Sequence, residues 1–324
     1  MFEGTIVILQ LFFKLINMDK PKVIVICGPT ASGKTALSIE LAQKINGEII
    51  SSDSMQIYKY MDIGTAKPTE NERKECPHHL IDFVEPDCDF SVADYVKLAH
   101  EKILDITNRG KMPIICGGTG LYINSVINDV DFGEYENDYS VRNRLTEMLE
   151  KDGVDALIER LREIDPVSAK RLHPNNTKRI IRAIEFYEIS GVPISVHQEM
   201  TKQRESRYEP LMFMINLDRE VLYERINRRV DIMVEDGLID EVSSLMERGY
   251  SRELNSMQGI GYKEVISSLY KEVSLDCAID MIKQNSRRYA KRQLTWFRRD
   301  ERINMLDSLN ASEKAIEIIK KARF

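Results

Sequence analysis

The chain has 324 residues and a formal net charge of −6, with 43% hydrophobic and 30% charged side chains. This length accommodates about two domains, and the composition is that of an ordinary globular protein and excludes a fibrous or disordered chain. The negative net charge excludes attraction of nucleic acid by bulk charge, so such a partner would have to be held by local basic patches.

The cysteines and the N-terminus bear on where the protein acts. The five cysteines are odd in number and show no C-x-x-C spacing, which argues against a disulfide framework and favours the cytoplasm. Residues 1–17 are mostly apolar, but the run is too short to span a bilayer and lacks the basic start of a signal peptide. We therefore expect 1–17 to be an N-terminal extension, and we expect no membrane partner.

The segment 28–35 reads GPTASGKT and fits the phosphate-binding pattern GxxxxGK[ST] at every fixed position. A β-branched run over 22–27 precedes it and predicts a buried strand. Leu37, Leu41 and Ile45 follow at helical spacing and predict a helix that begins inside the motif. A strand, a glycine loop and a helix N-terminus in this order direct backbone N–H groups toward an anion. The segment therefore predicts a phosphate or diphosphate site.

All eight residues of the motif are candidate contacts to that phosphate or diphosphate: Gly28, Pro29, Thr30, Ala31, Ser32, Gly33, Lys34 and Thr35. Lys34 would add a positive charge, and the Thr35 hydroxyl would be a ligand for Mg²⁺.

Further along the chain, short apolar runs over 48–51, 113–116 and 211–216 predict strands, and helical patterns lie between them. Strands that alternate with helices predict a parallel sheet, in which ligands bind beyond the carboxyl ends of the strands. We predict an α/β fold with a P-loop NTPase-like parallel sheet flanked by helices. Asp53 and Thr119 each follow a predicted strand end and should lie near the phosphate loop.

The pattern changes near residue 131, where an acidic connector leads into a helical stretch with few strand signals. We predict an inserted all-helical subdomain over 133–206. The catalytic core is predicted to comprise 18–132 and 207–310, and the last residues, 311–324, are assigned to a C-terminal tail.

Two residue types near the phosphate loop suggest catalysis. A carboxylate at Asp53 could accept a proton from an attacking group; the alternative is a turn or capping aspartate. In the helix that follows Asp218, Arg225 and Arg229 lie four residues apart beside the buried stripe. Such a pair could clamp the phosphates and stabilise a leaving diphosphate, and Arg229 is the stronger candidate. The alternative is a solvated basic face.

Two basic patches could bind RNA. The stretch 170–182 has five basic and no acidic residues, and 287–302 has seven basic residues interleaved with aromatic ones. Basic groups beside aromatic rings suit an RNA backbone with splayed bases. Each patch alone could equally be a solvated helix face.

The motifs, taken together and in order, resemble those of the bacterial tRNA dimethylallyltransferases. The resemblance extends from about residue 18 to residue 299. It rests on GPTASGKT at 28–35, SSDSMQIYK at 51–59, MDIGTAKP at 61–68, PHHLID from 77, GGTGLY from 117, HPNNTKRIIRAIE from 173, QGIGYKE from 258 and AKRQLTWFR from 290.

This resemblance implies transfer of a dimethylallyl group from dimethylallyl diphosphate to N6 of the tRNA adenosine 3′ of the anticodon (position 37), with Mg²⁺ as cofactor. In that reaction Asp53 would accept the amine proton, and Thr35 and Arg229 would hold the diphosphate. The adenosine would leave the anticodon-loop stack to reach them. The implied tRNA contacts are Asp53, Ser54, Met55, Gln56, Thr119, Arg142, Lys178, Arg179, Ile180, Ile181, Arg182, Gln258 and Gly259.

The chain departs from the family pattern at Ser286 and Tyr289, and no catalytic assignment depends on either. A rival function is an ATP-dependent kinase of small molecules or nucleotides, with Asp53 activating a hydroxyl. The strand over 113–116, however, ends in Gly-Gly-Thr and not in the acid that a kinase requires. An RNA-binding switch without chemistry would leave Asp53 unexplained. We expect a monomer.

Overall fold

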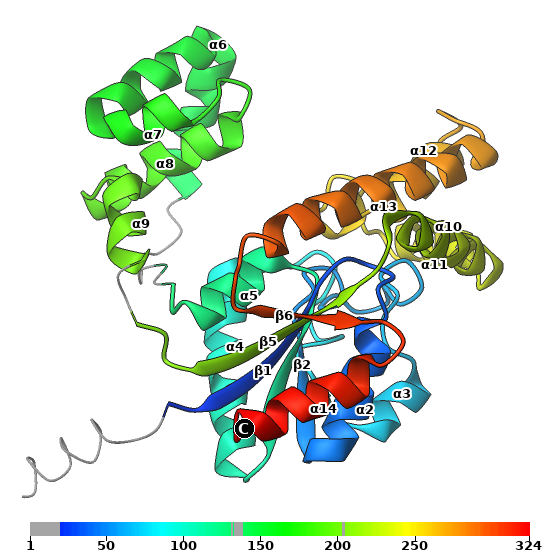
Figure 1. Ribbon diagram of the computed structural model, residues 1–324. Helices are drawn as coiled ribbons and strands as arrows, with labels where there is room; N and C mark the ends of the chain where they lie inside the picture. Colours follow the sequence, from blue (N-terminus) through cyan, green and yellow to red (C-terminus); the bar gives the residue numbers. More distant parts are fainter. Residues whose placement is uncertain (1–19, 131, 133–138, 203–204) are drawn as a thin grey trace, which may run out of the picture. The chain divides into compact units, whose positions relative to one another are not determined.

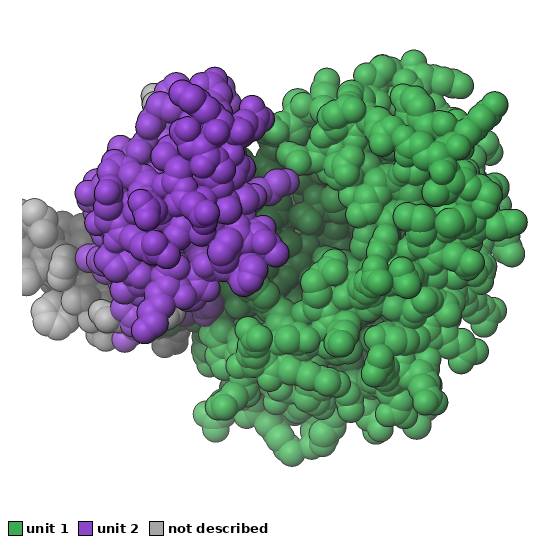
Figure 2. Space-filling model, turned by 90° about the horizontal axis from the view of Figure 1, so that it is seen from above, with its two compact units in different colours: residues 1–127, 207–324 green, residues 128–206 purple. Residues whose placement is uncertain are grey.

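The computed structural model describes residues 20–130, 132, 139–202 and 205–324. The N-terminal extension expected at 1–17 and the acidic connector at 134–138 lie outside these described residues. The chain divides into two compact units, which Figure 2 colours separately: unit 1 is Met1–Ile127 with Arg207–Phe324, and unit 2 is Asn128–Ser206. Unit 2 covers the segment for which the sequence predicts a helical insertion.

Unit 1 is built on a six-stranded sheet in which every pair of neighbouring strands is parallel. The order β3-β2-β4-β1-β5-β6 places β1 and β4 at the centre, with Ile24 opposite Ile114. This sheet confirms the predicted α/β class. Its strands are β1 (Lys22–Cys27), β2 (Gly47–Ser51), β3 (His78–His79), β4 (Met112–Gly117), β5 (Glu209–Asn216) and β6 (Ile303–Asp307).

The helices of unit 1 cover both faces of this sheet and the carboxyl ends of its strands (Figure 1). They are α2 (Lys34–Ile45), α3 (Glu70–Glu75), α4 (Val92–Asn108), α5 (Gly120–Ile127), α10 (Arg219–Glu235), α11 (Leu238–Glu247), α12 (Tyr262–Leu269), α13 (Leu275–Phe297) and α14 (Ala311–Lys321), with a 3₁₀ turn η1 (Ser256–Gln258). On one face, the strand residues Ile24, Ile26 and Ile114 form a single buried cluster with α2 and α14.

The assignment of 311–324 to a tail is wrong, because α14 belongs to the core of unit 1. Ala311, Ala315 and Ile319 recur every four residues and are buried in the same cluster as α2. Ser312 also accepts a hydrogen bond from Lys44 of α2, at 3.0 Å. The helical spacing of these apolar residues was present in the sequence, and it marks an amphipathic helix that packs on the sheet.

A second buried cluster connects the segment after β2 to the helices α10 to α13. Ile57 and Met61 pack there against Val230, Leu238 and Tyr262. Because this cluster joins segments that are far apart in the sequence, it fixes the loop that follows Asp53 against α10 and α12. These elements form the walls of the cavity described below.

Unit 2 is a helical bundle with its own hydrophobic core. Its helices are α6 (Tyr139–Ile164), α7 (Pro166–Arg171), α8 (Thr177–Ser190) and α9 (Ile194–Lys202). Helix α6 is interrupted at Gly153, which has φ 80° and ψ 178°. This conformation disfavours side chains larger than that of glycine, so the two halves of α6 form a kink at this residue.

Candidate active site

The phosphate loop connects β1 to α2, as the sequence predicts. Gly33 and Ala31 have left-handed backbone conformations, with φ 94° and φ 61°, which turn the chain sharply before the first turn of α2. Lys34 closes over the loop by donating a hydrogen bond from Nζ to the carbonyl oxygen of Pro29, at 2.7 Å. Four residues of the loop are buried, namely Gly28, Pro29, Ala31 and Ser32, whereas Lys34 and Thr35 are partly exposed. An anion could therefore reach the loop from the side on which Lys34 lies.

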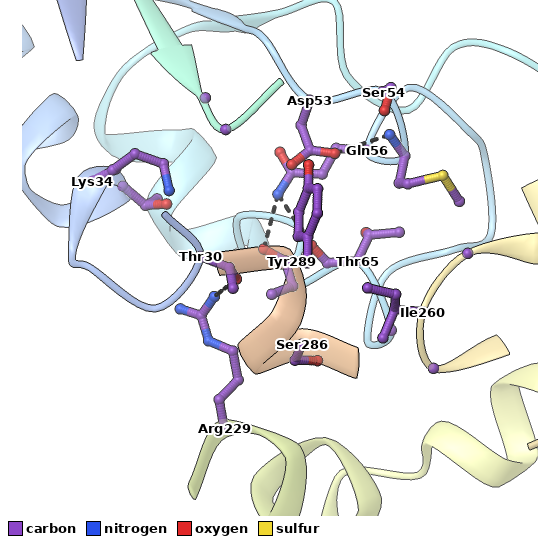
Figure 3. A pocket seen from close by; sticks show the side chains of 18 of the residues that line it. Thr30, Lys34, Asp53, Ser54, Gln56, Thr65, Arg229, Ile260, Ser286 and Tyr289 are labelled. Atoms are coloured by element: carbon purple, nitrogen blue, oxygen red, sulfur yellow. Dashed lines mark hydrogen bonds between the residues drawn. The ribbon is translucent and has the colours of Figure 1, made fainter. Parts of the chain in front are cut away.

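That side of the loop opens into a cavity of about 400 Å³, a size typical of small-molecule sites. Thr30, Lys34 and Thr35 line it from the phosphate loop, and Asp53 and Arg229 line it from the segment after β2 and from α10. Figure 3 shows most of these side chains together with others from α13 and from the turn before α12. The predicted phosphate site, the predicted base and Arg229 of the predicted arginine clamp therefore all line one cavity.

Asp53 follows the carboxyl end of β2, where the rule for parallel sheets places ligand-binding residues. Its Oδ1 accepts a hydrogen bond from the backbone N–H of Met55, at 2.9 Å, which is the pattern of an Asx turn. Asp53 therefore does stabilise a turn, which was the alternative role considered from the sequence, but its carboxylate still lines the cavity. Figure 3 shows the carboxylate facing the hydroxyl end of Tyr289. A fixed, cavity-lining carboxylate can act as a general base.

Two cations face the phosphate end of the cavity. Arg229 donates from Nη1 to the Thr30 hydroxyl at 3.4 Å (Figure 3), and burial lowers the pKa of its guanidinium. Burial also lowers the pKa of Lys34, with the charge of nearby Arg229 adding to the effect. Desolvated cations are unfavourable unless they are paired, so a bound anion would stabilise this arrangement. Arg225, in contrast, is exposed, and the predicted clamp reduces to Arg229.

Gln293 was not identified from the sequence, although it holds the phosphate loop in place. The side chain is buried, and its Oε1 accepts from the Thr30 N–H while its Nε2 donates to the Gly118 carbonyl, both at 2.9 Å. This amide bridges α13, the phosphate loop and the end of β4. Ala290, Gln293 and Phe297 form the buried stripe of α13, and a glutamine within an apolar stripe was the signal that could have found it.

Ser286 and Tyr289, the two departures from the family pattern, both line the cavity. Burial and the nearby Asp53 charge raise the pKa of Tyr289 to about 12, so its hydroxyl stays protonated at neutral pH and can donate a hydrogen bond. No function was predicted for these residues from the sequence. The structure puts both of them in the wall of the site, with Tyr289 next to the predicted base Asp53.

Residues 56–300 match the sequence model described as IPP transferase. A tRNA dimethylallyltransferase of Acetivibrio thermocellus is 51% identical over 300 residues, covering 92% of this chain and 96% of the relative. One of Thermoanaerobacter sp. is 51% identical over 279 residues, covering 86% and 89%.

The chain belongs to the IPP transferase family. Its fold is similar to that of the crystal structure of a full-length tRNA isopentenylpyrophosphate transferase from Bacillus halodurans, with a TM-score of 0.69 and 46% identity over 94% of this chain and 96% of the other. It is also similar to a eukaryotic dimethylallyltransferase described as acting on tRNA, with a TM-score of 0.82 and 32% identity over 93% and 80%.

In this IPP transferase, most of the tRNA contacts implied for unit 1 lie at the cavity. Ser54, Met55, Gln56, Gln258 and Gly259 line it. Thr119 supports the same wall, because its Oγ1 accepts from the Ser54 N–H at 3.0 Å.

The amide of Gln56 is engaged within the protein. Its Nε2 donates to the carbonyl oxygens of Thr65 and Ala66, at 3.2 and 3.1 Å, and its Oε1 accepts from the Ser51 hydroxyl. Gln56 therefore orders the following loop, in addition to lining the cavity.

The contacts implied for unit 2 of this IPP transferase differ in character. Lys178 and Arg179 are exposed in the first turn of α8. Arg142 and Arg182 both bind the buried carboxylate of Glu185, through Nη2 at 2.8 Å and Nη1 at 3.1 Å. A single buried carboxylate thus holds the two guanidinium groups side by side on α6 and α8.

Ile180 and Ile181 were included among the tRNA contacts, and the structure contradicts this assignment for their side chains. They are 0% and 9% exposed and belong to the hydrophobic core of unit 2. On an amphipathic helix, core-facing residues recur every three or four positions, and exposed residues lie between them. The run 178–182 therefore offers Lys178, Arg179 and Arg182 to a ligand and uses its two isoleucines for packing.

Proposed function

We propose that this IPP transferase moves a dimethylallyl group from dimethylallyl diphosphate to N6 of the tRNA adenosine 3′ of the anticodon. Membership of the family supports transfer to tRNA. The observation that carries the proposal for this chain is the cavity at the end of the sheet. It brings a phosphate loop, two desolvated cations and one carboxylate together, and a prenyl transfer from a diphosphate needs all three.

The phosphate loop would hold the leaving group. The diphosphate oxygens would be bound by Lys34, Thr35 and Arg229, which line the phosphate end of the cavity. When the C–O bond breaks, the electron pair stays on the diphosphate, and its negative charge grows. Fixed donors at that position stabilise the transition state more than the ground state.

The apolar part of the wall would accept the prenyl chain. Val230, Met233, Ile260 and Ile282 line the cavity together with the polar groups. An apolar chain of five carbons is stabilised by removal from water, at about 25 cal/mol per Å² of buried surface. Such a wall also excludes water, which would otherwise compete with the amine for the prenyl carbon.

Asp53 would complete the reaction. The exocyclic amine of adenine attacks the first carbon of the prenyl group, the C–N bond forms, and the amine nitrogen loses a proton. The Asp53 carboxylate accepts this proton while diphosphate departs with the electrons of the broken bond. Because adenine must leave its base stack to reach the cavity, the residues at 54–56 and 258–259 are proposed to hold the extruded nucleotides.

We propose Mg²⁺ as the cofactor, held in part by the Thr35 hydroxyl, which lines the phosphate end of the cavity. Mg²⁺ commonly uses one or two protein oxygens together with substrate phosphates and water. When bound, the ion would offset charge on the departing diphosphate.

The kinase alternative is not supported. Strand β4, next to β1, ends at Gly117 and continues into Gly118 and Thr119, where an ATP-dependent kinase of this fold would have an acid for its metal. The relatives described above are named as tRNA-modifying transferases.

We further propose that the protein acts as a cytoplasmic monomer. The phosphate loop, Asp53 and Arg229, which the proposed reaction uses, all come from one chain, and the five cysteines show no C-x-x-C spacing, which fits the cytoplasm.

The direct test incubates purified protein with unmodified tRNA, labelled dimethylallyl diphosphate and Mg²⁺, followed by digestion and mass spectrometry. We expect one prenylated adenosine per tRNA, at the position 3′ of the anticodon. A parallel reaction with ATP in place of the prenyl donor measures nucleotide turnover. ATP consumption without prenylated adenosine would overturn the proposal in favour of a kinase.

A salt titration tests the proposed role of unit 2. We expect tRNA affinity to fall steeply as salt is added, because phosphate contacts release counterions. Replacing both Lys178 and Arg179 by alanine should reduce the slope of log Kd against log salt by about two, or one for each phosphate contact. Lys320→Ala, an exposed lysine on α14, is the control and should leave the slope unchanged. Equal slopes for the double variant and the control would contradict the assignment.

A further inference from the structure

The loop that follows Asp53 is held by an acidic side chain from a distant helix. Glu241 of α11 accepts hydrogen bonds from three consecutive backbone N–H groups, those of Asp62, Ile63 and Gly64, at 2.8, 2.7 and 3.0 Å. Its Oε1 also accepts from the Tyr262 hydroxyl at 2.6 Å. Successive N–H groups that converge on one anion form a strong, directional contact. Each carboxylate oxygen of Glu241 therefore accepts two hydrogen bonds.

The clamped segment leads directly into the cavity wall. Gly64, Thr65 and Ala66 line the cavity, and Figure 3 shows Thr65 near Gln56, whose amide binds the carbonyls of residues 65 and 66. At the far end, the buried ammonium of Lys67 binds the carboxylate of Asp62 at 2.6 Å. The N–H groups of residues 62–64 are thus fixed by Glu241, and the carbonyl groups of residues 65 and 66 by Gln56.

Glu241 also holds a second cavity-lining segment through Tyr262. The Tyr262 ring is fully buried and packs so closely on the loop that a Cβ added to Gly64 would lie 2.5 Å from it. Residues 259–261 precede Tyr262 directly and line the cavity beside this loop, where Figure 3 shows Ile260; a Cβ added to Gly261 would lie 4.0 Å from the carbonyl oxygen of Gly64. Burial and the charge of Glu241 raise the pKa of Tyr262 well above its ordinary value, so the hydroxyl remains a donor.

We propose that Glu241 is a positioning residue for the transfer reaction: it holds the adjoining cavity-lining segments 64–66 and 259–261 together. These segments adjoin residues 54–56 and 258–259, which are proposed to hold the extruded nucleotides, and Glu241 itself does not line the cavity. The proposal rests on the proposed function. It implies that changing Glu241 impairs the chemical step without impairing the phosphate loop, which Glu241 does not contact.

The test compares Glu241→Gln with Glu247→Gln, an exposed glutamate on the same helix. Glutamine is nearly isosteric, but its NH₂ group faces two N–H or O–H donors in either orientation. We expect kcat to fall about 30-fold in Glu241→Gln, and hydrogen exchange of the 62–64 amides to accelerate at least tenfold. The affinity for inorganic diphosphate, measured by calorimetry, should stay within twofold. Glu247→Gln should match the wild-type protein in all three measurements.

Tyr262→Phe is the second variant and provides the test if Glu241→Gln does not fold. It keeps the three backbone contacts but releases the segment 259–261 from Glu241, so we expect a fivefold loss of kcat with the 62–64 amides still protected. The proposal is overturned if either folded variant keeps the wild-type kcat, or if kcat and diphosphate affinity fall together as in general unfolding. Absence of prenyl transfer by the wild-type protein would instead refute the proposed function, whereas the exchange and diphosphate measurements would still show whether the clamp exists.

Discussion

Asp53→Asn is expected to lower kcat for prenyl transfer by about a thousandfold, within the range of general acid–base catalysis. Asparagine keeps the side-chain oxygen that accepts from the Met55 N–H, so the turn should survive while the basic carboxylate is lost. The affinity for tRNA should change less than threefold. Single-turnover transfer assays and filter binding measure the two quantities separately.

Asp53→Ala is the companion variant, because it removes both the base and the turn contact. If proton transfer is the main role of Asp53, the asparagine and alanine variants should have similar rates. A nearly active asparagine variant beside an inactive alanine variant would show that Asp53 acts through the turn, and would remove it from the chemistry. Parallel loss of turnover and tRNA affinity in both variants would indicate a binding role.

Arg229→Leu is expected to lower kcat by about 100-fold, the effect typical of losing one donor to a developing negative charge. The guanidinium faces the phosphate end of the cavity and contacts Thr30, so it is placed to stabilise diphosphate as the C–O bond breaks. Inhibition by inorganic diphosphate should weaken in the same variant. Steady-state kinetics with varied donor, together with product inhibition, measure both effects.

Arg225→Leu is the matched control. It lies one helical turn earlier on α10 and is exposed, so its loss should change kcat less than twofold. Equal losses in the two variants would show that α10 acts through its overall positive charge, and the specific contact of Arg229 would no longer be needed to explain the kinetics.

The features that could be predicted from the sequence are those determined by residues close together in the chain. The phosphate loop was predictable because the backbone conformation, the lysine and the flanking strand and helix lie within about 25 residues of one another. The parallel sheet followed from the alternation of strands and helices. Strand β3 has only two residues, too few to show an alternation of apolar and polar side chains. Strand β6 directly follows a charged stretch and was not predicted as a strand.

Residues that act across long sequence distances were harder to predict. Gln293 meets Thr30 across 263 positions, and Glu241 meets Gly64 across 177, so no local pattern reveals either contact. Ile180 and Ile181 show the opposite error, because a run that resembles a binding motif also contains the core positions of its helix. Periodicity separates these two roles only when each residue is assigned to a helix face.

The amide bridge at Gln293 has a thermodynamic consequence. The same helix carries the exposed cations Arg288 and Lys291, so α13 is bonded at one point to the donor site and presents charge to solvent at another. If RNA shifts this helix, it must alter donor affinity by the same factor by which donor alters RNA affinity. Binding of the donor and binding of RNA would then be thermodynamically coupled through α13, and double-titration calorimetry would measure this coupling free energy directly.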